Sequence, residues 1–244
     1  MRNARIDRPR IELGRDTVAL LEQVTSDGFA VIPEALAQAE TVTLLEALER
    51  SDLPRSRAGI RHGMRHAPVA GMARDQRLLG IAQRILGSDA FPYRATLFGK
   101  SPAANWLVVW HQDTALPLRE KRETPGWGPW SVKDGVIYAH APVSALSQVV
   151  ALRLHLDEST ADNGPLRILP GTHNLGVLTD EALHQLSAEI APQDCLVPRG
   201  GILVMRPLIV HASSKSRSES PRRVLHVEYA ASQKIANGLE MAIA

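Results

Sequence analysis

The spacing of apolar residues divides the chain into a helical first third and a longer part made of short strands. Leucine and valine recur three or four residues apart after Asp16 and again after Ala39, a spacing typical of amphipathic helices. A third helix is predicted over residues 75–86, and residues 28–33 have the pattern of a short strand. The helices are therefore expected to come early in the chain.

From residue 91 onward the apolar runs are short and are separated by Gly, Pro and Asn, which is typical of strands and turns. Only residues 179–190 are predicted to be helical in this part. Helices followed by many short strands indicate an α+β fold in which the strands close into a sandwich or barrel. Strands are expected at residues 93–98, 106–110, 135–139, 149–157, 201–205 and 222–229.

The length of 244 residues favours a single domain, 1–244. Residues 1–90 would be mainly helical support, and residues 91–232 would form the β core. Residues 117–135 are rich in Pro, Gly and charged residues, which disfavours long regular structure. Because Trp127 and Trp130 give this segment apolar surface, we expect either a mobile cover over the barrel mouth or a static loop whose tryptophans pack into the core.

The composition is that of a soluble globular protein, with 44% apolar and 22% charged residues. A net charge of +2 is too small for the basic face that nucleic-acid binding needs, so no nucleic-acid partner is expected. Cys195 is the only cysteine, which excludes an internal disulfide and a thiolate-rich metal site and fits a cytoplasmic location. We expect neither an export signal nor a membrane-spanning segment, because no apolar run is long enough.

Candidate metal ligands stand at the end of one predicted strand. His111 and Asp113 are two residues apart, so both side chains point to the same face of an extended chain. With His211 they would form a 2-His-1-carboxylate set, which leaves metal positions open for a cosubstrate and O₂. A second candidate set is His155, Asp157 and His173.

The residues that follow His211 distinguish the two sets. Ser213 and Arg222 come shortly after it, and an arginine can bind a carboxylate through two parallel hydrogen bonds. No such anion-binding group follows the second set at this spacing, so the first set is the better prediction.

Three stretches together resemble the phytanoyl-CoA dioxygenase family of Fe(II)- and 2-oxoglutarate-dependent oxygenases, and the resemblance extends from about residue 98 to residue 230. The stretches are Trp-His-Gln-Asp at residues 110–113, Asn-Gly-Pro-Leu-Arg-Ile-Leu-Pro-Gly-Thr-His at residues 163–173, and His-Ala-Ser followed after eight residues by Arg-Arg at residues 211–223. The fold that this resemblance implies is a double-stranded β-helix, a cupin-like jelly-roll barrel with the N-terminal helices packed on one face.

The same resemblance implies roles for individual residues. His111, Asp113 and His211 would bind iron, Arg222 would pair with the distal carboxylate of 2-oxoglutarate, and Ser213 would hydrogen-bond it. The alternative anchor is Arg223, because neighbours in a strand point to opposite faces, although the family spacing favours Arg222.

Further candidates have plain structural alternatives. Thr114 would touch the cosubstrate or be a hydroxyl at a strand end, and Arg153 would lie beside 2-oxoglutarate or on the surface. Lys100 precedes the predicted metal-ligand strand in the manner of the family, or is a solvated lysine without a function, and His226 is expected to be a hydrogen-bonded strand histidine.

The resemblance implies an enzyme that hydroxylates a small molecule while 2-oxoglutarate and O₂ yield succinate and CO₂. The carboxylate of Asp113 favours hydroxylation, because halogenating relatives lack it. The alternatives are a jelly-roll metalloprotein with a reaction that does not use 2-oxoglutarate, and a non-catalytic barrel that binds small molecules. Residues 55–66 carry four arginines and two histidines, which suits an acidic or acyl-CoA-like substrate but is also typical of a solvated loop.

Overall fold

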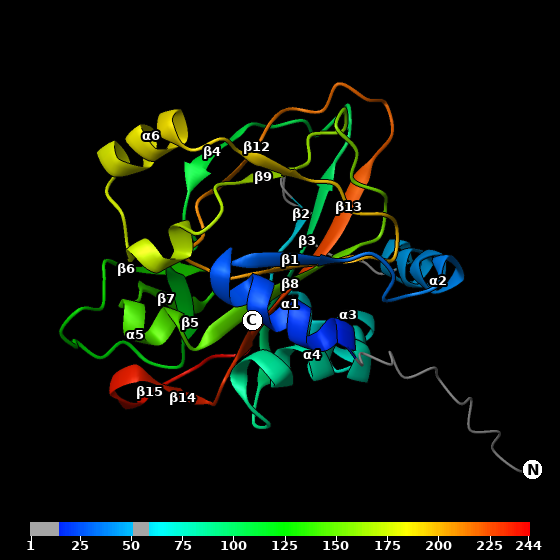
Figure 1. Cartoon of the computed structure of the whole chain (residues 1–244). Helices are drawn as coiled ribbons and strands as arrows, with labels where there is room; N and C mark the ends of the chain where they lie inside the picture. The colour runs from blue at the N-terminus through cyan, green and yellow to red at the C-terminus, as the bar shows by residue number, and fades with distance from the viewer. Residues whose placement is uncertain (1–14, 51–58) are drawn as a thin grey trace, which may run out of the picture.

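The structure is a computed structural model that describes residues 15–50 and 59–244 (Figure 1). Its helices are α1 (Arg15–Ser26), α2 (Gln38–Glu49), α3 (Ala67–Ala73), α4 (Gln76–Leu86), α5 (Val143–Leu146) and α6 (Asp180–Glu189). Its longer strands are β3 (Phe91–Lys100), β7 (Val136–His140), β8 (Val149–His155) and β13 (Arg222–Ala230). Its shorter strands are β1 (Phe29–Ile32), β2 (Gly59–Ile60), β4 (Val108–His111), β5 (Ala115–Leu118), β6 (Trp130–Lys133), β9 (Leu166–Ile168), β10 (Gln193–Cys195), β11 (Ile202–Met205), β12 (His211–Ser213), β14 (Lys234–Ile235) and β15 (Leu239–Glu240).

The predicted helices near the N-terminus are confirmed as α1, α2 and α4. Helix α4 begins after Asp75, whose carboxylate accepts a hydrogen bond from the backbone N–H of Arg77. The helix buries Leu78, Ile81 and Ala82 on one face. Helix α3 was not predicted, because its seven residues include a proline and a glycine and are too few to show a helical period.

The largest sheet has six antiparallel strands in the order β1-β11-β8-β13-β3-β2. Side chains alternate along each strand, so the sheet has two chemically different faces. One face carries Val150, Leu152 and Leu154 and packs in one apolar cluster with residues of α1 to α4. Figure 1 shows α1, α3 and α4 together on this side of the sheet.

The opposite face of this sheet is polar where β3 and β13 pair. The register places Lys100 opposite Arg222 and Arg94 opposite Glu228, and His226 lies between these two pairs. All five residues are at even positions and point to the same side, away from the helices.

A second sheet, β10-β9-β12-β4, covers the polar face of the first. Its residues Leu166 and Ile168 share an apolar cluster with Phe29 and Leu203 of the six-stranded sheet. The space between the sheets is thus apolar beside β1 and β11 and polar beside β13 and β3. Helices and antiparallel sheets together confirm the α+β class.

Residues 119–129 form no helix or strand, as the composition of the segment 117–135 predicts. The two ends of the segment belong to strands β5 and β6 of a three-stranded antiparallel sheet in the order β5-β7-β6. Trp127 is 7% exposed and belongs to an apolar cluster with Leu116 and Leu146, and Trp130 packs against the same cluster. The packed tryptophans match the static alternative and give no support to a mobile cover.

All six strands predicted after residue 91 are confirmed, with ends shifted by at most two residues. Strands β5, β6, β9, β10 and β12 were missed, because each has only three or four residues and shows no period of its own. None of the helices in the two described ranges is both long and apolar enough to cross a membrane.

Candidate metal centre

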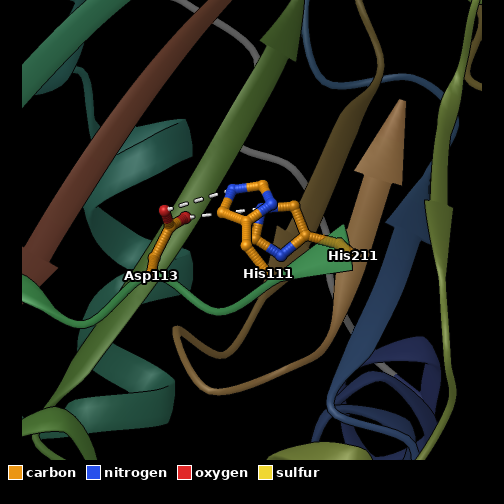
Figure 2. A group of neighbouring side chains, drawn as sticks. All are labelled: His111, Asp113 and His211. Carbon is orange, nitrogen blue, oxygen red and sulfur yellow. Dashed lines mark ion pairs between the residues drawn. The ribbon is translucent and has the colours of Figure 1, made fainter. Parts of the chain in front are cut away.

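Three potential metal ligands meet at the edge where β4 and β12 pair. His111 ends β4 and lies directly opposite His211, the first residue of β12, and Asp113 follows in the turn after β4. The Nε2 atom of His211 is 3.6 Å from the Asp113 carboxylate, and the Nε2 atom of His111 is 3.9 Å from it. Figure 2 shows both imidazoles turned toward this carboxylate.

Backbone hydrogen bonds fix the orientation of both imidazole rings. The Nδ1 atom of His111 is 2.9 Å from the carbonyl oxygen of Val109, and that of His211 is 2.9 Å from the carbonyl oxygen of Ile209. A carbonyl can only accept, so each Nδ1 carries the proton and each Nε2 has a free lone pair. This arrangement is typical of metal-binding histidines, whose second ring nitrogen is held by a hydrogen bond.

Gln112 explains why the metal-site motif has a glutamine between the two ligands. Its side chain points away from them, donates to the carbonyl oxygens of Leu208 and Gly176, and accepts from the N–H of Leu178. The N–H of Asp113 donates to the carbonyl oxygen of Pro207. These bonds attach the turn after β4 to the loop before His211, so the three ligands keep their relative positions.

The electrostatics of the site favour the protonation states that a metal ion requires. Burial lowers the pKa of His211 to about 4, against the opposing effect of Asp113, so its imidazole is neutral near pH 7. Burial alone would raise the pKa of the Asp113 carboxyl, but His211 and His111 hold it well below its ordinary value. Two imidazoles and one carboxylate are the donor set that binds non-haem iron with open positions.

In the part of the chain that the structure describes, these three residues are the only group of His, Cys, Asp and Glu close enough to hold a metal ion. The alternative set does not converge. Asp157 is bound by Arg223 and Arg199, and His173 lies near the carbonyl oxygen of Thr25. His155 is 2% exposed, and neither of its ring nitrogens has a hydrogen-bond partner.

Arg222 and Arg223 face opposite sides of β13. Arg222 is 5% exposed, and its guanidinium donates to Ser213 Oγ at 3.4 Å and to the carbonyl oxygen of Asn163 at 3.3 Å. Arg223 instead forms ion pairs with Asp157 at 2.7 Å and Glu49 at 2.9 Å. Arg222 therefore lies on the inner side with the metal ligands, and Arg223 does not.

Two further candidates also lie inside. Arg153 is 7% exposed rather than on the surface, and its guanidinium bonds the Nδ1 atom of His226 at 3.0 Å. Thr114 Oγ1 is hydrogen-bonded to His140 Nδ1 at 2.7 Å and lines a cavity of about 370 Å³ beside Asp113. His226 is a hydrogen-bonded strand histidine, as predicted.

Two features of the inner face were not predicted. Lys100 is 2% exposed and hydrogen-bonded to Ser213 Oγ at 2.6 Å, so the alternative of a solvated lysine is wrong. Glu228 is 3% exposed and bound by Arg94 and by the Tyr93 hydroxyl. The signal that would have found them is the even spacing of polar residues on β3 and β13, which becomes informative only when the strands are known to pair.

The sequence of this chain is similar to those of known proteins. The profile of the family described as phytanoyl-CoA dioxygenase (PhyH) matches residues 24–224. L-proline trans-4-hydroxylase of Streptomyces griseoviridis is 24% identical over 241 residues, which cover 83% of this chain and 82% of that enzyme. Ectoine dioxygenase of Streptomyces anulatus is 24% identical over 196 residues, which cover 73% of this chain and 59% of that enzyme.

The fold has relatives among solved structures. The epimerase SnoN, solved in complex with Fe3+, alpha ketoglutarate and nogalamycin RO, matches with a TM-score of 0.68 at 16% identity. The match covers 90% of this chain and 85% of SnoN. At this identity the likeness establishes the fold alone, and the chemistry must be argued from the residues.

Proposed function

Because the chain belongs to the phytanoyl-CoA dioxygenase family, we propose that it is an Fe(II)- and 2-oxoglutarate-dependent dioxygenase that hydroxylates a small molecule. In this reaction one oxygen atom of O₂ enters the product alcohol and the other enters succinate, while 2-oxoglutarate loses CO₂. The observation that carries the proposal is that Arg222 lies on the same inner face as the metal ligands. It is a buried cation that contacts no carboxylate among the described residues.

The side chains of the site fit the iron and the 2-oxoglutarate that this reaction needs. His111, Asp113 and His211 would hold the iron, which when bound supplies the O₂ chemistry that side chains lack. Arg222 would bind the distal carboxylate of 2-oxoglutarate with the Ser213 hydroxyl beside it.

Two other residues have positioning roles in this proposal. Arg153, on the inner face of β8, would line the cosubstrate pocket and hold His226. Thr114 lies one residue after Asp113 and would orient His140 at the edge of the substrate cavity.

We also propose that the two facing sheets form a double-stranded β-helix. Two facing antiparallel sheets, of six and four strands, support this jelly-roll arrangement. The single domain 1–244, with a helical part to residue 90 and a jelly-roll core over residues 91–232, is part of the same proposal. It is supported by the apolar cluster that α1 to α4 share with the six-stranded sheet.

The substrate that we propose is a small acid rather than an acyl-CoA. The cavity beside Asp113 has a volume of about 370 Å³, which suits a small molecule and would leave the nucleotide of coenzyme A outside. Arg61, Lys133 and His140 line it, and the two cations suit an anionic group. Of the basic segment 55–66, residues 55–58 lie outside the described residues.

The two alternative functions leave either Arg222 or the metal ligands without a role. A jelly-roll metalloprotein that does not use 2-oxoglutarate would leave this buried cation without an anionic partner, which is unfavourable. A non-catalytic barrel would not need an oriented set of metal ligands.

Succinate formation tests the proposal. The Fe(II)-loaded protein is incubated with 2-oxoglutarate, O₂ and a library of small carboxylic acids, their amides and their CoA thioesters. We expect some free acids to accelerate succinate formation and to gain one oxygen atom in the product. Absence of 2-oxoglutarate turnover with every compound would contradict the enzyme proposal, and turnover with thioesters only would contradict the substrate class.

A further inference from the structure

A second cavity, of about 300 Å³, lies beside the loops that hold the metal ligands, and the proposed reaction gives it no role. It is lined mainly by residues of α5, of the loop after β9 and of the loop after β11. None of its lining residues lines the cavity beside Asp113. Two of them, Gly176 and Leu208, accept hydrogen bonds from Gln112, which itself lines the cavity beside Asp113. The turn after β4 therefore lies between the two cavities.

Arg206 is the cation of this second cavity, and it has no counterion among the described residues. It follows β11 and is half-buried, and its guanidinium donates to the carbonyl oxygen of Ser147 at 3.4 Å. Burial lowers the pKa of Arg206, and no carboxylate opposes this effect. His173 is the other titratable residue of the lining, and burial lowers its pKa, so it is neutral near pH 7. A partly desolvated guanidinium that faces a cavity without a carboxylate is suited to bind an anion.

The wall and the rim of the second cavity also carry apolar side chains. Val143 and Leu208 belong to its lining. Val143, Leu175 and Val177 are 46%, 53% and 52% exposed, and the last two flank Gly176, another residue of the lining. Exposed apolar side chains that gather around one hollow mark a binding surface, whereas single scattered ones do not.

We propose that this second cavity is an accessory binding site for a small amphipathic carboxylate, which pairs its carboxylate with Arg206 and lays its apolar chain on Val143 and Leu208. The volume is at the lower end of the range for ligand pockets, so the ligand is small. An acid without an apolar chain would leave the rim exposed, and an apolar molecule without an acid would leave Arg206 unpaired. The inference goes beyond the proposed function, because neither iron nor 2-oxoglutarate takes part in it.

Two competing explanations account for the same features. In the first, the cavity holds only water and Arg206 is solvated, so a carboxylate and the matching amide would bind equally weakly. In the second, the apolar rim is a contact between two copies of the chain, so the signals of rim residues would depend on protein concentration.

The experiment follows the methyl signals of the metal-free protein by NMR during titration with three probes. Hexanoate has both a charge and an apolar chain, hexanamide has the same chain without the charge, and acetate has the charge without the chain. We expect hexanoate to shift the methyl signals of Val143 and Leu208. It should bind about 10-fold or more tightly than either of the other probes.

Arg206→Met and Arg222→Met are matched variants, because each replaces an arginine that contacts no carboxylate among the described residues. Arg206→Met should bind hexanoate about 10-fold or more weakly than wild type and no better than it binds hexanamide. Arg222→Met should bind hexanoate like wild type. This control excludes the explanation that hexanoate occupies the cosubstrate pocket.

Four outcomes would overturn the inference. On wild type they are hexanoate binding no tighter than hexanamide binding, and rim signals that move on protein dilution but not with hexanoate. On the variants they are unchanged hexanoate affinity in folded Arg206→Met, and loss of hexanoate binding in Arg222→Met. The wild-type outcomes decide the matter even where Arg206→Met does not fold. Failure to bind Fe(II) or 2-oxoglutarate would contradict only the proposed function, so the two failures are distinguishable.

Discussion

Arg222 and Arg223 are neighbours on β13 whose removal should have opposite consequences. Arg222 is buried, and the described residues give it no carboxylate, whereas Arg223 is bound to Asp157 and Glu49. We therefore predict that Arg222→Met impairs 2-oxoglutarate binding without loss of stability, and that Arg223→Met impairs stability without loss of 2-oxoglutarate binding.

The magnitudes follow from the surroundings of each guanidinium. In the complex, Arg222→Met would leave a buried carboxylate without its main partner, and breaking a buried pair costs about 3 kcal/mol or more, which is roughly a 100-fold increase in Kd. In the free protein the same change removes a buried charge that has no counterion, so the free energy of unfolding should stay the same or increase. Arg223 is 29% exposed and Asp157 keeps Arg199, so Arg223→Met should cost only about 1–2 kcal/mol of stability.

Two measurements on both variants test this crossed pattern. Urea unfolding gives the stability of the free protein, and anaerobic calorimetry with Fe(II) present gives the Kd for 2-oxoglutarate. Weaker 2-oxoglutarate binding in Arg223→Met than in Arg222→Met would refute the assignment of the inner face. A large loss of stability in Arg222→Met would refute the argument that its charge has no partner in the free protein.

The remaining predictions concern the polar inner face and a strained turn. Burial alone would raise the pKa of Glu228, but Arg94 and His226 lower it below the ordinary 4.5, so this carboxylate contributes stability above about pH 4.5 that is lost as the pH falls further. Glu228→Gln should accordingly cost about 3 kcal/mol in urea unfolding at pH 7, and the difference from wild type should shrink at about pH 4. Gly164→Ala should lower the thermal stability more than Gly238→Ala. Both positions have a positive φ, but only at Gly164 would a Cβ collide with backbone. Equal decreases in the unfolding temperature of the two variants would show that this collision does not matter.

How much of the site could be predicted depends on how far apart in the sequence its residues lie. His111 and Asp113 were predictable, because two residues in an extended segment share a face wherever that segment lies. The choice of His211 needed the residues that follow it, and the structure places it opposite His111.

The inner cluster was not predictable in the same way. Lys100 and Glu228 acquire their surroundings from the register of β3 against β13, strands more than a hundred residues apart. From the sequence alone, a buried charged residue in a strand cannot be distinguished from a solvent-exposed one until the partner strand is known.

Local composition also gave a wrong prediction at Pro117. Pro117 and the charges around it indicate a loop, yet β5 forms there. It is the edge strand of its sheet, and on its outer side the carbonyl oxygen of Pro117 accepts a hydrogen bond from the N–H of Ala242, a contact that does not use the N–H group that proline lacks.

A crystal structure of the protein grown without O₂ in the presence of Fe(II) and 2-oxoglutarate tests the central claim most directly. The account predicts iron bound by Nε2 of His111, Nε2 of His211 and a carboxylate oxygen of Asp113, with the distal carboxylate of 2-oxoglutarate on the Arg222 guanidinium. Iron bound elsewhere, or a distal carboxylate that rests on Arg223 or in solvent, would contradict it.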